Sequence, residues 1–593
     1  MTSSKSFLLA TSIIILTFST STVFAQQATN STAFNKLLND YYEEGLLLNP
    51  IAATQRGDNR YNDLLPNNIS FPYLKSTHDY NVKFRRLLAT YERNSLNSSD
   101  KISFDIVNDQ TQQAMGRERF HLEFMPFNQG AGSLPTALPS MGSGLGIQPF
   151  KTAQDYNNWL KRIDAFSGWA DTAIANFNKG IASGMVLPKA LVLKMIPQLE
   201  AQTIADTSKN IFYAPIRNMP TSFLETEKTS IRLAYQDALT SKIIPTYKKL
   251  ADYLKNIYLG KARSTSGYNA LPNGPAIYRF LVQYYTTGSK SPEKIYETGL
   301  KEVTRITKEI DVIKNKVGFS GSTGSLFTFL KTDKQFFPFT TEEQVLDSFR
   351  AILPRMEPNL KKLFNIVPKA AFEVRAIEKF KAASSASNYQ TGTEDGSRPG
   401  YFNARILDAV TFNTPGMESL FAHEAIPGHH FQLSLQQENI ALPKVRRYAG
   451  YNAFIEGWGL YAESLGDELG LYTNAYEKIA ALSSELFRAA RLVVDVALHT
   501  GKMTREEAIT YMVEKAGLDE RIATSEVERY MANPGQALSY KTGELKIKEL
   551  RTKYEKSLGT KFNIKSFHDA ILLGGSMPLS VFKSYMDDWA QKQ

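Results

Sequence analysis

Hydrophobic residues recur along most of the chain at the spacing of an α-helix. Between residues 226 and 259 apolar side chains return mostly every three to five positions, and residues 474–499 show the same period. A stripe of this kind gives a helix one apolar face to bury against a core. Pro245 lies inside the first stretch, where it predicts a kink or a break because proline has no N–H to donate.

Local signals mark the ends of further helices. Thr504 and Glu507 have the spacing of a capping box, which predicts a helix that runs to about Ala516 and is ended by Gly517. Pro292, directly after a serine, predicts another helix start.

Strand-like alternation is rare in this chain. A short strand pair is expected at residues 371–374 and 404–407, on either side of a polar stretch. The predicted fold class is therefore all-α with minor β. Segments rich in Gly, Ser, Pro, Thr or Asn are expected to form loops at 94–100, 130–146, 264–274, 318–325 and 382–400.

The first 25 residues follow a different pattern. Lys5 precedes an apolar run from Phe7 to about Phe18, and small or polar residues follow up to Ala25. This order is typical of a secretory signal peptide that is cleaved after Ala25. The alternative is an uncleaved anchor, but the run is shorter than the ~20 residues that span a membrane. We therefore expect a periplasmic or secreted mature chain, residues 26–593, with no stable membrane anchor.

Composition narrows the possible chemistry. The absence of cysteine excludes disulfides and thiolate ligands, so a metal would have to bind His, Asp or Glu. It also argues against a lipid-modified lipoprotein. The formal charge of +10 is spread along the chain rather than clustered, which favours a solvated basic surface and no nucleic-acid partner.

Three of the seven histidines fall within residues 421–432, which read FAHEAIPGHHFQ. His423 followed by Glu424 is the beginning of the zinc-hydrolase motif HExxH, in which the second histidine comes four positions after the first. In this chain that position is Pro427. The residue types point to a metal site, whereas the spacing departs from the motif.

Helix geometry limits how the other histidines can approach His423. In a regular helix His430 would share its face but lie about 10 Å away along the axis, and His429 would point elsewhere. A local bulge at Pro427-Gly428 is expected to absorb the two extra residues and bring a second histidine close. Two alternatives stay open: a proline-kinked helix with purely structural histidines, and a metal-free site with histidine as general base.

A third metal ligand is expected in residues 454–463, FIEGWGLYAE. Glu456 and Glu463 are seven positions apart and so share one helix face. Because an unpaired buried carboxylate is costly, a metal would satisfy one of them. Glu456, between Phe454 and Trp458, is the preferred ligand, and Glu463 is compatible with a surface-facing edge.

These motifs resemble the DUF885 family of bacterial, often exported proteins of largely unknown function. The family in turn resembles helical zinc peptidases of the gluzincin type. The motifs that carry the resemblance are HEAIPGHHFQ, EGWGLYAE, RAARLVVDVALHTGKMTREEAITYM, PGQALSYKTGELKIKELR and FHDAILLGGSMPL.

The resemblance implies one large helical domain over residues 26–593, with an N-terminal helical half at about 26–380 and a metal-site half at about 400–593. It also implies a gluzincin-like architecture with a deep cleft. The family pattern HExxPGH favours His429 over His430 as the second ligand.

The same resemblance implies roles for individual residues. His423, His429 and Glu456 would hold Zn²⁺, and Glu424 would be the general base. Further candidates, for stabilising an oxyanion or binding substrate, are Tyr530, Tyr540, His568, Lys541, Arg488 and Arg491, the two arginines suiting a substrate carboxylate.

Asp495 and His499 are four positions apart on a predicted helix. One expectation is that the two side chains pair with each other. The other is that Asp495 hydrogen-bonds to a metal ligand and orients it without binding the metal itself.

The function expected from the sequence is an exported, zinc-dependent peptidase or amide hydrolase that acts on short peptides. The alternatives are a metal-dependent hydrolase of another amide or ester, and a non-catalytic exported binding protein on a peptidase-like scaffold.

Overall fold

The computed structural model describes residues 31–382 and 386–593, so the expected signal peptide lies outside the described residues. The fold is all-α with one small sheet, which confirms the predicted class. Among the described residues, none of the helices combines the length and the apolar character needed to cross a membrane.

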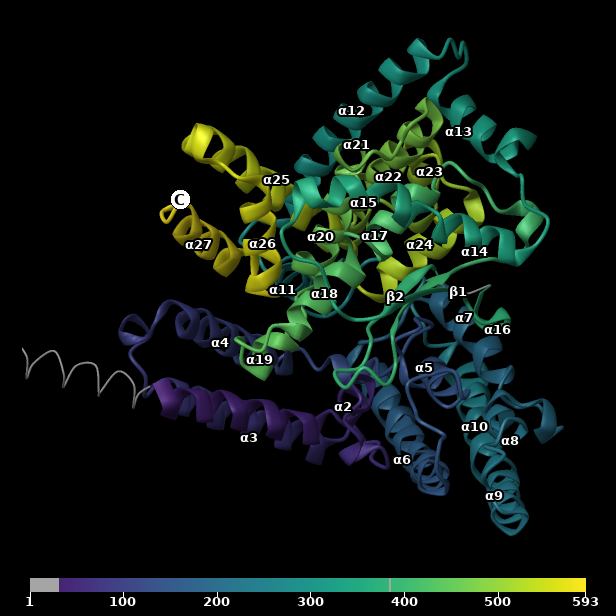
Figure 1. Cartoon of the computed structure of the whole chain (residues 1–593). Helices are drawn as coiled ribbons and strands as arrows, with labels where there is room; N and C mark the ends of the chain where they lie inside the picture. The colour runs from purple at the N-terminus through teal and green to yellow at the C-terminus, as the bar shows by residue number, and fades with distance from the viewer. Residues whose placement is uncertain (1–30, 383–385) are drawn as a thin grey trace, which may run out of the picture.

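The first part of the chain forms a helical layer, drawn from purple to blue in the lower part of Figure 1. In this layer α6 buries Trp159, Phe166 and Trp169 in a core shared with α7, α9 and α10. Its helices are one over residues 31–48, α2 (Pro50–Arg56), α3 (Phe71–Leu88), α4 (Ser98–Glu118), α5 (Leu134–Met141), α6 (Ala153–Ser183), α7 (Lys189–Glu200), α8 (Ala214–Arg217), α9 (Glu225–Ala238) and α10 (Ile244–Tyr253).

Two sequence predictions differ from this layer in detail. The helix with Pro245 continues without a break, because a π-helical turn (Leu239–Ile243) joins α9 to α10 and places the proline in the first turn of α10. The wider π turn directly before the proline accommodates its ring and its missing N–H within the continuous helix. The predicted loop 130–146 contains α5, which forms because Leu138 and Met141 are buried in the core.

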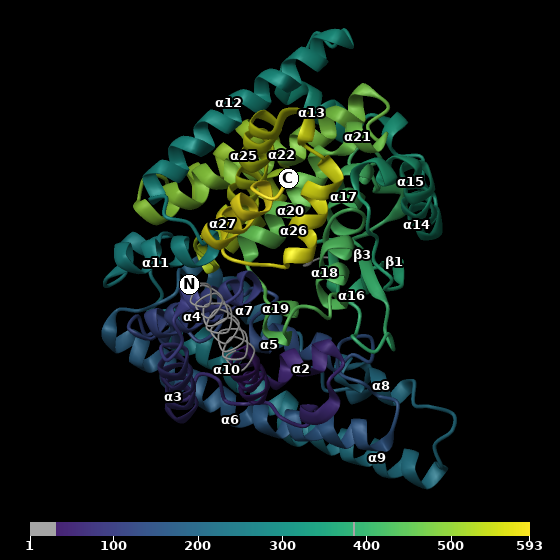
Figure 2. The same ribbon diagram turned by 60° about the vertical axis from the view of Figure 1, so that its left-hand side comes forward.

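The later helices form a second, larger bundle (Figures 1 and 2). Helices α11 to α15 belong to it in packing although they precede residue 380. Its helices are α11 (Gly274–Thr286), α12 (Pro292–Lys316), α13 (Thr323–Thr332), α14 (Glu342–Arg350), α15 (Ile352–Leu363), α16 (Lys379–Ala382), α17 (Met417–Glu424), α18 (His429–Glu438), α19 (Lys444–Arg447), α20 (Asn452–Ser464), α21 (Gly466–Leu469), α22 (Ala475–Thr500), α23 (Arg505–Ala516), α24 (Glu520–Ala532), α25 (Ser539–Leu558), α26 (Ile564–Gly574) and α27 (Leu579–Ala590).

Helix α22 lies at the centre of this bundle, and residues 489–499 are buried on all sides. The predicted caps are confirmed for its neighbours: Thr504 caps α23, Gly517 ends it, and α12 begins at Pro292. Helix α25 approaches α20 so closely that a Cβ on Gly457 would lie 2.5 Å from the Gly543 backbone. Glycine at both positions therefore permits the contact that brings α25 to the centre.

The small sheet has the order β1-β3-β2, with β1 (Phe372–Ala376) parallel to β3 (Gly400–Ala404) and β2 (Asn388–Gln390) antiparallel to it. The predicted second strand at 404–407 begins and ends earlier. The register pairs residues 400–404 with β1 and 401–403 with β2, so the strand ends at Ala404 although Ile406 is still buried.

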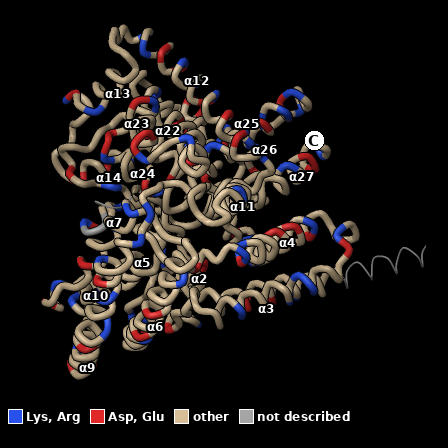
Figure 3. Tube along the Cα trace, turned by 180° about the vertical axis from the view of Figure 1, so that it is seen from behind, with Lys and Arg blue, Asp and Glu red and all other residues tan. Residues whose placement is uncertain are grey.

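Charged residues of both signs are interspersed along the helices of the described chain (Figure 3). This distribution agrees with the scattered charge seen in the sequence. The absence of a nucleic-acid partner stays a prediction.

Candidate metal centre

The HEAIPGHH segment folds as two helices joined by a tight turn. Helix α17 ends at Glu424 and α18 begins at His429, and the Ile426–Pro427 peptide bond between them is cis. The predicted bulge within one helix is therefore wrong. A Cβ on Gly428 would lie 1.9 Å from the His423 carbonyl oxygen, so only glycine allows the chain to return across the end of α17.

The turn places His429 beside His423, facing Glu456 on α20. His423 Nε2 lies 3.5 Å and His429 Nε2 lies 3.4 Å from the same atom, Glu456 Oε2. The three ligand atoms all lie within 4.8 Å of one another. The two histidines are buried and Glu456 is only partly exposed, so the group faces a largely dry interior.

This donor set fits zinc in both chemistry and spacing. Two histidines and one glutamate form a known catalytic zinc set that leaves one position open. With bonds of about 2.0–2.1 Å, ligand atoms at neighbouring corners of a tetrahedron are about 3.4 Å apart. The separations of 3.4 and 3.5 Å to Glu456 match that value.

His430 points away from this group. Its Nδ1 lies 3.0 Å from the Tyr389 hydroxyl, and its ring packs against Phe372 with centroids 4.7 Å apart. The structure thus brings His429 and not His430 to the candidate centre.

Glu463 holds His423 from behind. Its Oε1 lies 2.8 Å from His423 Nδ1, and its Oε2 accepts hydrogen bonds from Ser419 (2.9 Å) and Ser484 (2.8 Å). Burial would raise the pKa of this carboxyl, but Arg488 and His423 outweigh it and hold the pKa below its usual value. A carboxylate that accepts from Nδ1 leaves Nε2 free to bind a metal.

Removing the Glu463 charge should therefore weaken metal binding without removing a ligand. We expect Glu463→Gln to lower zinc affinity by about 10–100-fold, the usual cost of losing a partner of a ligating histidine. Competition with a fluorescent zinc chelator measures this, with the exposed Glu549→Gln as control. Equal affinity in the two variants would contradict the role given to Glu463.

Glu424 and Tyr540 complete the surroundings of the group. Glu424 is 8% exposed, and burial raises the pKa of its carboxyl. The Tyr540 ring stacks on that of His423, with centroids 6.3 Å apart and planes at 18°. Burial and then the charge of Glu456 raise the pKa of the Tyr540 hydroxyl, so it stays a hydrogen-bond donor.

The comparisons with known proteins place the chain in a family. The sequence profile described as "Bacterial protein of unknown function (DUF885)" matches residues 50–586. The chain belongs to the DUF885 family. The resemblance predicted from its motifs is confirmed. No protein of curated function matches it.

Two solved structures resemble this DUF885 protein over nearly its full length. One is described as a "putative lipoprotein" from Colwellia psychrerythraea: it is 27% identical, has a TM-score of 0.88, and the match covers 95% of this chain and 99% of that one. The other, a "putative lipoprotein of unknown function" from Shewanella oneidensis, is 18% identical with a TM-score of 0.72, and the match covers 93% and 99%. The second likeness shows the fold alone.

Three predicted site residues of the DUF885 protein are fully engaged elsewhere. Lys541 Nζ is buried among three carboxylates, Glu485 (2.5 Å), Glu544 (2.7 Å) and Glu302 (3.1 Å). It directly follows Tyr540 and so faces a different side of α25. The structure places this lysine in a buried ion cluster and not beside the three ligand side chains.

Tyr530 and His568 are likewise structural. The Tyr530 hydroxyl donates to Glu526 at 2.8 Å. His568 has both ring nitrogens occupied, by the Leu363 carbonyl (2.9 Å) and by the Tyr461 hydroxyl (2.8 Å). Neither side chain has a hydrogen bond to spare for a substrate, so Tyr540 is the one candidate donor that contacts the metal group.

Asp495 and His499 do not pair, because each side chain meets a different neighbour of α22. Asp495 accepts hydrogen bonds from the Tyr278 hydroxyl (2.7 Å) and the Gly535 N–H (3.1 Å). His499 Nδ1 instead accepts from the Tyr268 N–H at 3.1 Å. The side chain that hydrogen-bonds to His423 and orients its ring is Glu463, not Asp495.

The buried Asp495 should make stability fall as the pH rises. Burial raises its pKa to about 7, whereas an unfolded aspartate ionises near pH 3.9. Between these two pKa values the folded state binds one proton more than the unfolded state. The stability that this proton contributes is fully present below about pH 4 and is lost as the pH rises through 7. We expect Asp495→Asn to remove roughly 2–3 kcal/mol of the stability difference between pH 5 and pH 8. Urea unfolding at the two pH values measures it; equal pH dependence in both proteins would contradict it.

Sequence reasoning missed Glu463 and the role of Gly459. A Cβ on Gly459 would lie 2.8 Å from His423 Cε1, so this glycine makes room for the imidazole. The signal was present in the sequence, since Glu456, Gly459 and Glu463 occupy one stripe of α20. What the sequence lacked was the helix that faces this stripe.

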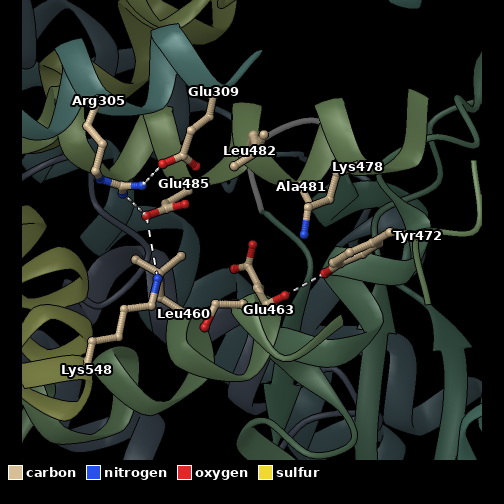
Figure 4. Close-up of a pocket in the computed structure, with 11 residues that line it drawn as sticks. Arg305, Glu309, Leu460, Glu463, Tyr472, Lys478, Ala481, Leu482, Glu485 and Lys548 are labelled. Atoms are coloured by element: carbon tan, nitrogen blue, oxygen red, sulfur yellow. Dashed lines mark hydrogen bonds and ion pairs between the residues drawn. The ribbon is translucent and has the colours of Figure 1, made fainter. Parts of the chain in front are cut away.

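A cavity of about 160 Å³ lies next to Glu463, between α12, α20, α22 and α25. Its lining includes Arg305, Glu309, Glu485 and Lys548, and Figure 4 shows the Glu463 carboxylate directed toward it. The cavity therefore reaches the residue that orients His423 rather than the three ligand atoms. The deep cleft expected for the DUF885 protein stays a prediction.

Proposed function

We propose that this DUF885 protein is an exported zinc-dependent hydrolase that cuts peptide bonds, or closely related amide bonds, in short substrates. The observation that carries the proposal is the convergence of His423 Nε2 and His429 Nε2 on Glu456 Oε2, at 3.5 and 3.4 Å, with Glu424 directly after the first ligand. A purely structural histidine cluster would not need that spacing.

Each residue of the group has a defined task in such a reaction. Zinc held by the three ligands would lower the pKa of a bound water and polarise the scissile carbonyl. Glu424 removes a proton from the attacking water and passes it to the leaving nitrogen as the C–N bond breaks. The Tyr540 hydroxyl donates a hydrogen bond to the carbonyl oxygen as negative charge develops there.

Export is proposed from the signal-like N-terminal pattern. Both similar structures are described as lipoproteins, which fits an exported family. This chain has no cysteine to carry a lipid, so we propose a freely soluble exported form rather than a lipid-anchored one.

Zinc-loaded protein incubated with a mixture of short peptides tests the proposal, with products identified by mass spectrometry. We expect cleavage that a chelator abolishes and added zinc restores. Cleavage of model amides or esters but of no peptide would support a non-peptidase hydrolase instead. A zinc-loaded protein that cuts none of these substrates would overturn the proposal in favour of a binding protein.

A further inference from the structure

Arg491 on α22 is held on four sides next to the candidate metal centre. Its guanidinium lies between two rings, 4.1 Å from the centroid of Phe487 and 4.5 Å from that of Tyr540. Its Nε donates to the Tyr530 hydroxyl (3.2 Å) and its Nη2 to Glu526 (3.0 Å). Its Nη1 is buried and has no hydrogen-bond partner among the described residues.

The charges around Arg491 do not balance. Glu526 is shared between Arg491 and Arg529, the latter at 2.9 Å. The other partner of Arg529 is the neutral side chain of Gln536. Two guanidinium groups thus share one carboxylate, and Arg491 is only 6% exposed. A buried positive charge that lacks a full counter-charge costs free energy, and an anion bound to the free donor would lower that cost.

Arg488, the other predicted carboxylate-binding arginine, has a different task. Its Nη2 lies 3.4 Å from Glu463 Oε1, and its Nη1 donates to the Ser484 side chain. Arg488 therefore helps to fix the carboxylate behind His423. Its Nε also lacks a partner among the described residues, but the charge of Arg488 is paired with Glu463, whereas Arg491 shares its carboxylate with Arg529.

The free donor lies close to where the reaction would take place. The Tyr540 ring contacts both partners, because its centroid is 4.5 Å from the Arg491 guanidinium carbon and 6.3 Å from the centroid of His423. The sum of these two separations is an upper limit, so the Arg491 guanidinium and the His423 ring lie within roughly 11 Å of each other. One extended residue of a peptide spans about 3.3–3.6 Å. If the C-terminal carboxylate of a peptide binds Arg491, this distance leaves room for one residue between the carboxylate and the peptide bond that lies at the metal centre.

We infer that Arg491 anchors the C-terminal carboxylate of the substrate, and that the protein removes single residues from the free C-terminal end of short peptides. The cleavage part of this inference rests on the proposed hydrolase function. The anchoring part rests on the free, buried guanidinium edge and is testable by binding alone. A charge-assisted hydrogen bond of this kind is among the stronger contacts a protein makes with a carboxylate.

Binding of N-acetyl-trialanine and of its C-terminal amide to zinc-loaded Glu424→Gln protein tests the anchor by calorimetry. We expect the free carboxylate to bind about 10–100-fold more tightly than the amide. Arg491→Lys keeps the charge but not the fork of donors, and should reduce this preference to a few-fold. Arg505→Lys is the control and should keep the preference, because Arg505, at the start of α23, pairs with Glu528 of α24. Equal binding of carboxylate and amide in the parent protein would overturn the anchor.

Cleavage of the same two peptides by the zinc-loaded wild type separates the two claims. Release of alanine from the free acid and not from the amide supports the inference. Equal cleavage of both, or internal cleavage of longer peptides, overturns it while the hydrolase function stands. A carboxylate preference in binding, without cleavage of these peptides or of any substrate in the wider mixture, supports the anchor and overturns the hydrolase.

Discussion

Replacing His429 with alanine is expected to abolish tight zinc binding, whereas replacing the adjacent His430 is expected to leave it intact. His429 Nε2 lies 3.4 Å from Glu456 Oε2, while His430 Nδ1 is engaged with the Tyr389 hydroxyl at 3.0 Å. Loss of a ligand should cost more than the about 10–100-fold that follows loss of an outer partner. Titration of metal-free protein with zinc, against a competing chelator, measures both variants.

The two alanine variants are matched controls for each other. Both remove one buried imidazole from the same helix, so a general loss of packing would affect them alike. Equal zinc affinity in the two variants, or a larger loss in His430→Ala, would contradict the ligand set.

Replacing Glu424 with glutamine should separate chemistry from metal binding. Glutamine keeps the shape of the side chain but cannot accept the proton of the attacking water. We expect kcat to fall by about 10²–10⁴-fold, the usual contribution of a positioned general base. Steady-state hydrolysis of a short peptide measures the loss.

The zinc content of the same Glu424→Gln preparation is the control, and it should equal that of the wild type. Unchanged turnover with zinc in place would rule out Glu424 as the base. A parallel loss of zinc and turnover would instead make Glu424 a ligand or a structural residue.

Much of the fold followed from local pattern. The periods of residues 474–499 and the capping box at Thr504 predicted α22 and α23 because these signals act within one or two helical turns. The strand at β3 was misplaced by a few residues, since its bounds are set by pairing with β1 and β2, which a local pattern does not reveal. The π-helical turn before Pro245 has no local signature in the sequence either.

The sequence was enough to name the candidate ligands but not the residues that support them. His423, Glu424 and Glu456 were proposed from residue type and local context, and His429 was preferred over His430 because of the family pattern HExxPGH. For Glu463 a surface-facing edge was left open, since the sequence does not show that α17 and α22 cover that side of α20.

Residue type alone was a poor guide for the remaining candidates. Lys541 follows Tyr540 directly, yet one side chain enters a buried ion cluster and the other stacks on His423. By residue type, His568 and Tyr530 are as suitable for catalysis as Tyr540, but their hydrogen bonds are made to other groups of the fold. Only the packing of α24, α25 and α26 around the centre decides among them.

The most direct test of the account is a crystal structure of zinc-loaded protein with anomalous diffraction recorded at the zinc edge. We expect one strong anomalous peak per chain, bonded at about 2.0–2.2 Å to His423 Nε2, His429 Nε2 and the Glu456 carboxylate. No peak between these three side chains, or a peak bound by His430, would contradict it.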